Sequence, residues 1–203
     1  MNTARAHTVA VLAKAGIDLP QLPLTATVRP RDQQEILDRL CCLHASAACA
    51  YGFNRSAALQ WLVQEGMSAS LTESETKYLR TGAGDLTQFQ GQIEAMWALC
   101  WCLSLVDLLD FWSACDDDFV YRLPDLKVGA PSETMRERAA LRNTTELTQA
   151  NDLAFCLHWV GRDAQLNARE APAGADLALI RNRRKALEWV SGRELWDATT
   201  VDT

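Results

Sequence analysis

The chain has 203 residues and a mass of 22.5 kDa, enough for one domain to bury a core without disulfides or a structural metal. It is 48% hydrophobic and 23% charged, with a mean hydropathy of −0.13, as in an ordinary globular domain. Its 20 Lys and Arg against 26 Asp and Glu give a net charge of −6. This balance argues against a general affinity for nucleic acid or anionic membranes, which a basic surface provides.

The sequence shows no signal for export or for spanning a membrane. The first apolar stretch, 8–13, is cut off by Lys14, and no later run approaches the ~18 apolar residues of a membrane span. The cysteines number seven, which is odd, and six of them stand among apolar residues, as buried free thiols do: Cys41, Cys42, Cys49, Cys100, Cys102 and Cys156. We therefore expect a reduced, cytoplasmic protein.

Hydrophobic spacing predicts helices through the first half of the chain. Segments 31–51 and 55–64 each carry an apolar face, and Asn54 is placed to cap the second. Thr72 begins the capping-box sequence Thr-Glu-Ser-Glu, which predicts a helix to about residue 79. The next predicted helix, 87–104, is apolar on nearly all sides, so we expect it near the centre of the fold.

The second half is predicted to contain one long loop followed by helices. Segment 105–129 holds scattered Asp, Pro and Gly and predicts a loop with one short helix. Three more helices are expected, starting at Ser132, at Asn151-Asp152 and at Asp176. No alternating strand pattern is present. The sequence therefore predicts an all-α fold: a single compact domain of seven or eight helices with a Trp-rich core and no significant sheet.

Four motifs carry a resemblance to a known family. They are Glu94–Trp101, Leu141–Glu146, Leu157–Ala164 and Arg183–Trp189, followed by Trp196-Asp197 and the terminal Val201–Thr203. Read together, they resemble domain of unknown function family 4272, a bacterial family with no assigned reaction. The resemblance covers about 48–203, so we expect a helical domain there and an N-terminal helical extension, 1–47, packed on its core.

The family motifs bring together a set of polar and aromatic side chains. The set is Glu94, Trp97, Arg142, Glu146, His158, Asp163, Arg183, Trp189, Asp197 and Asp202. Glu94, Trp97 and Trp101 share one helix face, and a carboxylate there should pair with Arg142 or Arg183. We interpret this pair as a buried structural bridge; the alternative is a carboxylate that binds a ligand or transfers protons.

Two further features of these motifs have structural and functional interpretations. His158 is interpreted as a hydrogen-bonded structural side chain facing Asp163 one turn on, with a general base as the alternative. The C-terminal acids Asp197 and Asp202 should lie with Trp196 against the basic cluster 183–185 and Trp189. Such packing would fix the C-terminus.

No pattern of metal or catalytic chemistry is present. Cys41, Cys42, His44 and Cys49 lie within one predicted helix and lack the paired spacing of zinc sites, so we expect no metal. The motifs of nucleotide-binding loops, hydrolase nucleophiles and zinc proteases are also missing. We assign no catalytic residue and no cofactor, and favour a protein that is not an enzyme.

An acidic, aromatic stretch is the strongest exposed feature that the sequence predicts. Its candidate partner-binding residues are Asp107, Asp110, Trp112, Asp116, Asp117, Asp118, Phe119 and Tyr121. Acidic charge beside aromatic rings is typical of interfaces with basic proteins. The first hypothesis is a protein-binding module for a basic partner, one version being a toxin-neutralising immunity protein.

Two other hypotheses stay open from sequence alone. One is a small-ligand binder or enzyme with a cleft lined by Glu94, Trp97, Arg142, His158 and Arg183. The other is a scaffold or homodimer without a ligand.

Overall fold

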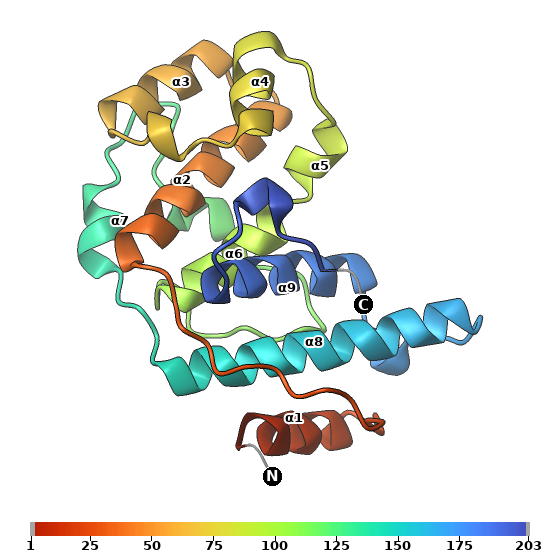
Figure 1. Ribbon diagram of the computed structural model, residues 1–203. Coiled ribbons are helices and arrows are strands. Elements are labelled where there is room, and N and C mark those ends of the chain that lie inside the picture. Colours follow the sequence, from red (N-terminus) through yellow and green to blue (C-terminus); the bar gives the residue numbers. More distant parts are fainter. Residues whose placement is uncertain (1–2, 202–203) are drawn as a thin grey trace.

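A computed structural model of the chain describes residues 3–201, and every regular element in that range is helical, as predicted (Figure 1). The α-helices are α1 Thr3–Lys14, α2 Gln33–Ala50, α3 Arg55–Gln64, α4 Glu73–Thr81, α5 Leu86–Gln90, α6 Ile93–Cys102, α7 Glu133–Arg138, α8 Thr144–Leu166 and α9 Leu177–Ser191. Short 3-10 turns lie at Ser68–Ser70, Phe119–Arg122, Pro172–Gly174 and Trp196–Ala198.

Three predicted helix starts are confirmed by their capping hydrogen bonds. The side-chain oxygen of Asn54 accepts from the Ala57 amide at 3.0 Å at the start of α3. At α4 the complete capping box forms, with Thr72 Oγ1 accepting from the Glu75 amide at 3.2 Å. Asp176 caps α9 by accepting from the Ala178 amide at 2.8 Å. These local signals fix where each helix begins.

The single helix predicted over 87–104 is wrong, because the structure has two helices there. Helix α5 ends at Gln90, and α6 begins at Ile93 after a break at Gly91 and Gln92. Glycine is a poor helix former, and here it closes α5 by donating from its amide to Thr87 O at 2.9 Å. Helix α6 is the apolar central helix expected, since all its residues from 95 to 102 are buried.

The predicted start at Asn151-Asp152 is also wrong. Helix α7 ends at Arg138, and α8 begins after Asn143, whose side chain accepts from the Glu146 amide at 3.0 Å. Asn151 and Asp152 lie buried inside α8. A buried Asp in mid-helix needs partners from another element, and helix α1 supplies them.

Helix α1 is fastened to the middle of α8 by a buried ion pair. Arg5 Nε and Nη2 donate to the two carboxylate oxygens of Asp152, each at 2.9 Å. Thr8 Oγ1 and Thr25 Oγ1 donate to the same carboxylate at 2.7 and 2.8 Å.

The boundary expected at residue 47 falls inside α2, which continues to Ala50. The N-terminal segment is therefore built into the helical core.

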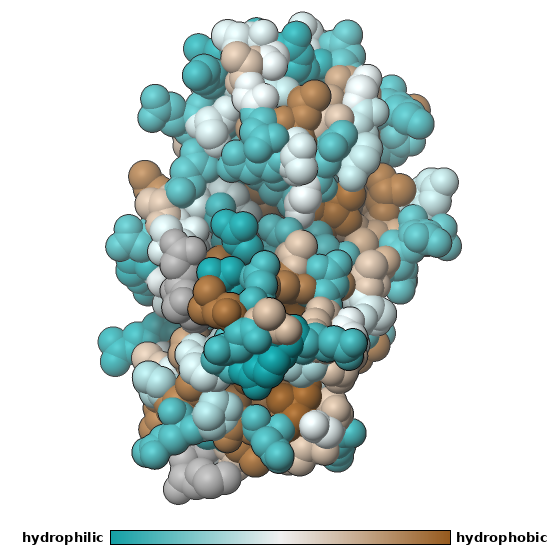
Figure 2. All heavy atoms as spheres, turned by 90° about the vertical axis from the view of Figure 1, so that its right-hand side faces the viewer, coloured by the Kyte–Doolittle hydropathy of each residue, from teal (hydrophilic) through white to brown (hydrophobic). Residues whose placement is uncertain are grey.

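The core lies where α2, α6, α8 and α9 meet. Helix α9 packs on both α6 and α8, and α8 lies between α9 and α1 (Figure 1). Five of the seven tryptophans belong to this core, namely Trp61, Trp97, Trp101, Trp189 and Trp196. The face shown in Figure 2 is mostly hydrophilic, with hydrophobic side chains in small patches between the polar ones. None of the helices within residues 3–201 has the length and apolar character needed to cross a membrane.

The long connection from α6 to α7 is irregular, as predicted, with one 3-10 turn at Phe119–Arg122. Its second half is anchored to α2 and α3. His44 Nε2 lies 2.8 Å from Pro124 O, and Trp61 Nε1 donates to Ala130 O at 2.9 Å. These contacts hold the connection in one place without regular secondary structure.

Candidate functional site

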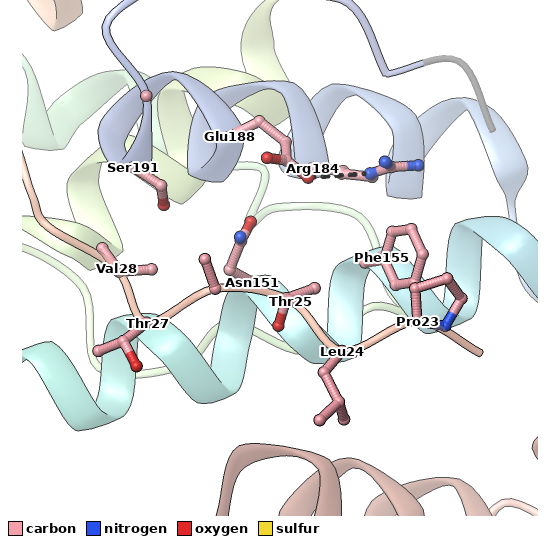
Figure 3. A pocket seen from close by; sticks show the side chains of 12 residues that line it. Pro23, Leu24, Thr25, Thr27, Val28, Asn151, Phe155, Arg184, Glu188 and Ser191 are labelled. Atoms are coloured by element: carbon pink, nitrogen blue, oxygen red, sulfur yellow. Dashed lines mark hydrogen bonds and ion pairs between the residues drawn. The ribbon is translucent and has the colours of Figure 1, made fainter. Parts of the chain in front are cut away.

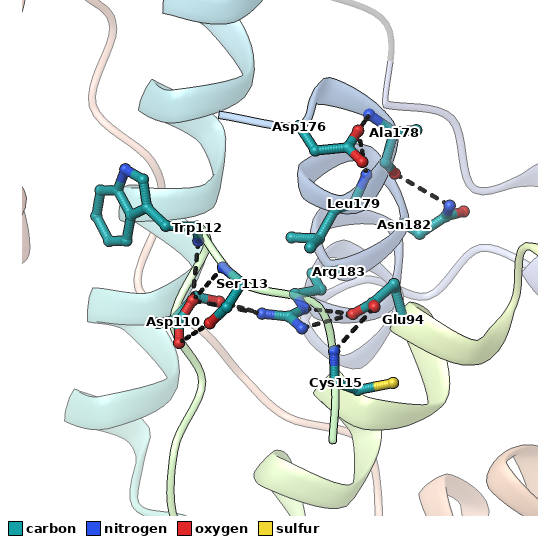
Figure 4. A network of polar contacts seen from close by, with 10 residues as sticks. All are labelled: Glu94, Asp110, Trp112, Ser113, Cys115, Asp176, Ala178, Leu179, Asn182 and Arg183. Carbon is teal, nitrogen blue, oxygen red and sulfur yellow. Dashed lines mark hydrogen bonds and ion pairs between the residues drawn. The ribbon is translucent and has the colours of Figure 1, made fainter. Parts of the chain in front are cut away.

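The carboxylate on the α6 face pairs with Arg183 of α9 (Figure 4). Glu94 Oε2 accepts from Arg183 Nε at 2.8 Å and from Nη2 at 2.5 Å, and the Arg183 side chain is 1% exposed. The other oxygen, Oε1, accepts from the Cys115 amide at 3.0 Å. Both carboxylate oxygens are therefore occupied by partners within the chain, in the geometry expected of a structural bridge.

The same bridge organises the start of the irregular connection. Arg183 Nη1 donates to the carbonyl oxygen of Asp110, whose carboxylate accepts from the amides of Trp112 and Ser113 at 2.8 and 2.9 Å. Burial alone would raise the pKa of Asp110, but these hydrogen bonds outweigh it and hold that pKa below its usual range. Asp110 is thus a charged anchor of the loop.

Arg142, the other candidate partner of Glu94, is occupied elsewhere. It forms an ion pair with Glu146 at 3.1 Å, and its guanidinium lies 4.6 Å from the centroid of the Trp101 ring. It also donates to Trp101 O at 2.7 Å and to Val106 O at 3.1 Å. Arg142 therefore holds the end of α6 and the first turn after it.

His158 contacts Arg184 of α9. Its Nδ1 lies 2.6 Å from Arg184 Nη1, and because a guanidinium can only donate, this nitrogen is the acceptor. The predicted contact between His158 and Asp163 is wrong. Five helical residues turn the side chain well off the original face, and Asp163 instead pairs with Arg169.

The C-terminal tail packs on the basic cluster as expected. The Trp196 and Trp189 rings meet edge to face at 5.7 Å, and Lys185 Nζ lies 5.0 Å from the centroid of Trp196. Asp197 Oδ2 accepts from the Ser74 amide at 3.3 Å, which ties the tail to α4. The expectation for Asp202 lies outside the described residues.

The acidic stretch presents both charge and apolar surface. Asp107, Asp116, Asp117 and Asp118 are all exposed. Tyr121 is 83% exposed and Val120 is 55% exposed beside them, and Leu108 and Val128 of the same connection also face solvent. The pair between Asp116 and Arg122 at 3.4 Å is exposed on both sides, so it is weak. We call Asp107, Asp116–Asp118, Val120 and Tyr121 together the acidic surface.

Three of the predicted partner-binding side chains do not belong to this surface. Asp110 is half-buried and anchors the loop. Phe119 is buried, with its ring edge to face with Trp97 at 5.3 Å. Trp112 is half-buried and packs against the core. Phe119 is the buried residue of the 3-10 turn and anchors it, while Val120, Tyr121 and Arg122 are exposed.

The cysteines are free thiols, six of them buried. Burial raises the pKa of each buried thiol, to about 12 for Cys42 and Cys102, which keeps them protonated and unreactive at neutral pH. No group of three or more His, Cys, Asp or Glu within residues 3–201 is arranged to hold a metal ion.

A cavity of about 350 Å³ lies between α8, α9 and the extended segment 23–28 (Figure 3). Asn151 and Phe155 of α8 face Arg184 and Glu188 of α9 across it. Glu94, Arg142 and Arg183 do not line it. Sequence reasoning missed this cavity because Asn151 has the local pattern of a helix cap and the segment 23–28 is remote in the chain.

The fold and its polar contacts define an all-helical domain in which the motif residues Glu94, Arg142, Glu146 and Arg183 form ion pairs within the chain. An acidic surface lies on an irregular connection. The chain matches the family described as "Domain of unknown function (DUF4272)" over residues 5–199 and belongs to it. The match begins well before residue 48, so it includes the segment predicted to lie outside the resemblance. No curated protein and no solved structure matches the chain.

Proposed function

We propose that this chain is a non-enzymatic binding module that docks a basic protein through its acidic surface. The observation that carries the proposal is the exposure of Val120 and Tyr121 beside the three consecutive acids Asp116–Asp118. Apolar side chains held in solvent contribute little to the stability of the domain itself. Next to Asp117 and Asp118, which have no ion pair among the described residues, they fit a partner that brings both basic and apolar side chains.

The way the surface is held also supports a docking role. Phe119 and Asp110 anchor the connection from inside, through the Trp97 ring and the Glu94–Arg183 bridge. A surface that is fixed before binding loses less conformational entropy when a partner docks. The buried pair would thus serve binding indirectly, by keeping the acidic side chains in place.

One form of this function is a toxin-neutralising immunity protein acting in a bacterial cytoplasm. Its partner would be a basic toxin such as a nuclease, and the net charge of −6 suits that partner. The free thiols fit a reducing compartment. If a captured partner degrades nucleic acid, adding the purified chain should stop the reaction.

The test is a quantitative capture from lysate of the cells that express the chain naturally. The tagged chain and a triple variant, Asp116→Lys, Asp117→Lys and Asp118→Lys, are compared at low and moderate salt by mass spectrometry. We expect one basic protein to be retained by the unmodified chain, to be lost as salt rises, and to be depleted about tenfold with the variant. Equal retention by both chains would exclude this surface as the docking site.

A small-ligand cleft around Glu94, Arg142, His158 and Arg183 receives less support from the geometry. Glu94 and Arg183 satisfy each other, and Arg142 is occupied by Glu146 and the Trp101 ring. A ligand there would have to displace these contacts. These side chains line neither the cavity beside Asn151 and Phe155 nor the cavity beside Arg39 and Trp196.

A further inference from the structure

We propose that the segment between α1 and α2 is a recognition surface in the polyproline II conformation, and that it docks a protein with a groove lined by aromatic side chains. We call residues 19–31 the strap. None of these residues belongs to the acidic surface, and the inference does not rest on the docking function proposed for that surface. It rests on a three-residue period in the burial of the strap, on its unpaired backbone and on the spacing of its prolines.

The side chains of the strap are buried with a period of three. One residue in every three is buried or half-buried, namely Leu19, Leu22, Thr25, Val28 and Arg31. The residues between them are exposed, except Pro30, which is half-buried. A strand would bury every second residue and an α-helix would follow a period of 3.6, whereas polyproline II has three residues per turn. The burial pattern therefore indicates polyproline II.

The backbone of the strap agrees with that conformation, which has no internal hydrogen bonds. Residues 19–30 form no backbone–backbone hydrogen bond within the described part of the chain. Asp32, directly after the strap, has φ −60° and ψ 144°, close to the polyproline II values of about −75° and 145°. The prolines of the strap also fix their own φ and disfavour helical backbone at each preceding residue. Local sequence thus favours the same conformation.

The inner ridge of the strap is fixed to the helix beneath it, because the strap runs across α8 (Figure 1). Thr25 Oγ1 donates to the Asp152 carboxylate at 2.8 Å, and the Val28 amide donates to Thr148 Oγ1 at 3.1 Å. A segment that is already held in one conformation loses little conformational entropy when a partner docks on it. The strap is therefore preorganised for recognition.

The two outer ridges of the strap present apolar surface to solvent. Every residue of one ridge is exposed: Pro20, Pro23, Ala26 and Arg29. On the other ridge, Leu24 is 61% exposed next to Pro23 in the chain. Two prolines separated by two residues stand on one ridge of polyproline II, and this is the spacing that grooves lined by aromatic side chains bind.

Arg29 specifies the charge of the partner. It is exposed on the proline ridge and has no ion pair among residues 3–201. A guanidinium in this position fits a carboxylate at the end of the groove. Because polyproline II rises about 3.1 Å per residue, that carboxylate should lie about 19 Å from the site that receives Pro23. The partner is thus a protein with an aromatic groove and an acidic end, unlike the basic partner of the acidic surface.

The test is a capture from lysate of the cells that express the chain naturally, with a competitor of defined chemistry. The competitor is decaproline, which adopts polyproline II in water, and a flexible Gly-Ser peptide of equal length is the control. We expect a protein retained by the tagged chain to be displaced by excess decaproline and to stay bound with the Gly-Ser peptide. If decaproline displaces no captured protein, the proposal is wrong.

Variants then place the contact on the strap. The double variant Pro20→Ala and Pro23→Ala should retain about tenfold less of the displaced protein, because two ring contacts are lost. Pro131→Ala, at an exposed proline outside the strap, is the matched control and should retain it fully. Equal retention by the double variant, with its fold checked by circular dichroism, would place the contact elsewhere and overturn the assignment.

A variant with a gain in binding separates recognition from a merely structural connection. Ala26→Pro extends the proline ridge, and the Ala26 amide has no hydrogen-bond acceptor among the described residues that the substitution would leave unpaired. It should retain more of the displaced protein than the unmodified chain does, because the strap becomes stiffer in the bound conformation. Weaker or equal retention would contradict recognition of polyproline II. The triple Lys variant of the acidic surface should retain this protein unchanged.

Discussion

Charged side chains have opposite surroundings in two regions of this protein. Along the seams of α8 with α1 and of α6 with α9, Asp152 and Glu94 are held by buried arginines at hydrogen-bond distance. On the connection between α6 and α7, Asp117 and Asp118 are exposed and have no ion pair among residues 3–201. The first region uses its charges to join helices, and the second presents its charges to solvent, where we propose that a partner docks.

The same family motifs contribute to both regions. Arg183 is a motif residue, and through Glu94 and the carbonyl of Asp110 it positions the beginning of the exposed stretch. The buried bridge therefore fixes Asp110 and Cys115, which belong to the connection that carries the exposed charges. The two regions should respond differently to substitution, the buried one in its folding free energy and the exposed one in binding.

The largest effect on stability is expected at the α1–α8 seam. Asp152→Ala leaves Arg5 buried without its carboxylate and should lower the free energy of unfolding by about 4 kcal/mol. Urea denaturation followed by circular dichroism measures this. The matched control is Asp163→Ala, whose partner Arg169 is exposed, and its effect should stay within about 0.5 kcal/mol. Equal effects of the two substitutions would contradict a structural role for the buried pair.

The next effect concerns the bridge between α6 and α9. Glu94→Gln keeps an acceptor for the Cys115 amide but removes the charge facing Arg183, and should cost about 3 kcal/mol of unfolding free energy. Glu146→Gln, at the half-exposed pair with Arg142, is the control and should cost less than about 1 kcal/mol. A Glu94 variant as stable as the unmodified chain would show that this carboxylate is not a structural bridge.

Acidification should weaken the fold through His44. Burial lowers the pKa of this histidine below its ordinary value of 6.5, so the unfolded chain binds a proton that the folded chain excludes. The stability of the folded state is not reduced by His44 above pH 6.5, where this side chain is neutral in both states. Below pH 6.5 the free energy of unfolding falls by at most about 1.4 kcal/mol per pH unit, because the unfolded chain takes up the proton. Urea midpoints measured from pH 7 to pH 5 should decline. His44→Gln should flatten that decline, and an unchanged slope would rule out His44 as its source.

The smallest effect on stability is expected on the acidic surface. Asp116→Asn, Asp117→Asn and Asp118→Asn together should change the free energy of unfolding by no more than about 0.5 kcal/mol, since these side chains are exposed. If this triple variant destabilised the domain as much as Glu94→Gln does, the claim that the exposed acids contribute little to folding would be contradicted.

The helices that sequence predicts best are those with local signals at their ends. The Asn54 cap and the Thr72–Glu75 box are complete within four residues, and both form as predicted. Asn151-Asp152 shows the same local signal, yet Asp152 bonds to Arg5, which is 147 residues away. A residue pattern identifies a side chain that needs partners, and it does not show whether those partners lie on the next turn or on another helix.

The candidate sites show the same limit. The helix face of Glu94 was predictable from spacing, whereas the choice of Arg183 over Arg142 depends on how α9 packs on α6. The burial of Phe119 depends on the position of Trp97, and the cavity beside Arg39 and Trp196 needs three remote segments to meet. Neighbouring residues alone predict none of these arrangements.

The most direct test of the division between buried and exposed charges is the rate at which the captured basic partner associates with the purified chain. Association rate constants would be measured at increasing ionic strength for the unmodified chain and for the triple Asn variant. We predict that the rate of the unmodified chain falls steeply with salt, and that the variant associates about tenfold more slowly at low salt with a shallower slope. Identical slopes and rates for the two chains would contradict the assignment of docking to the acidic surface.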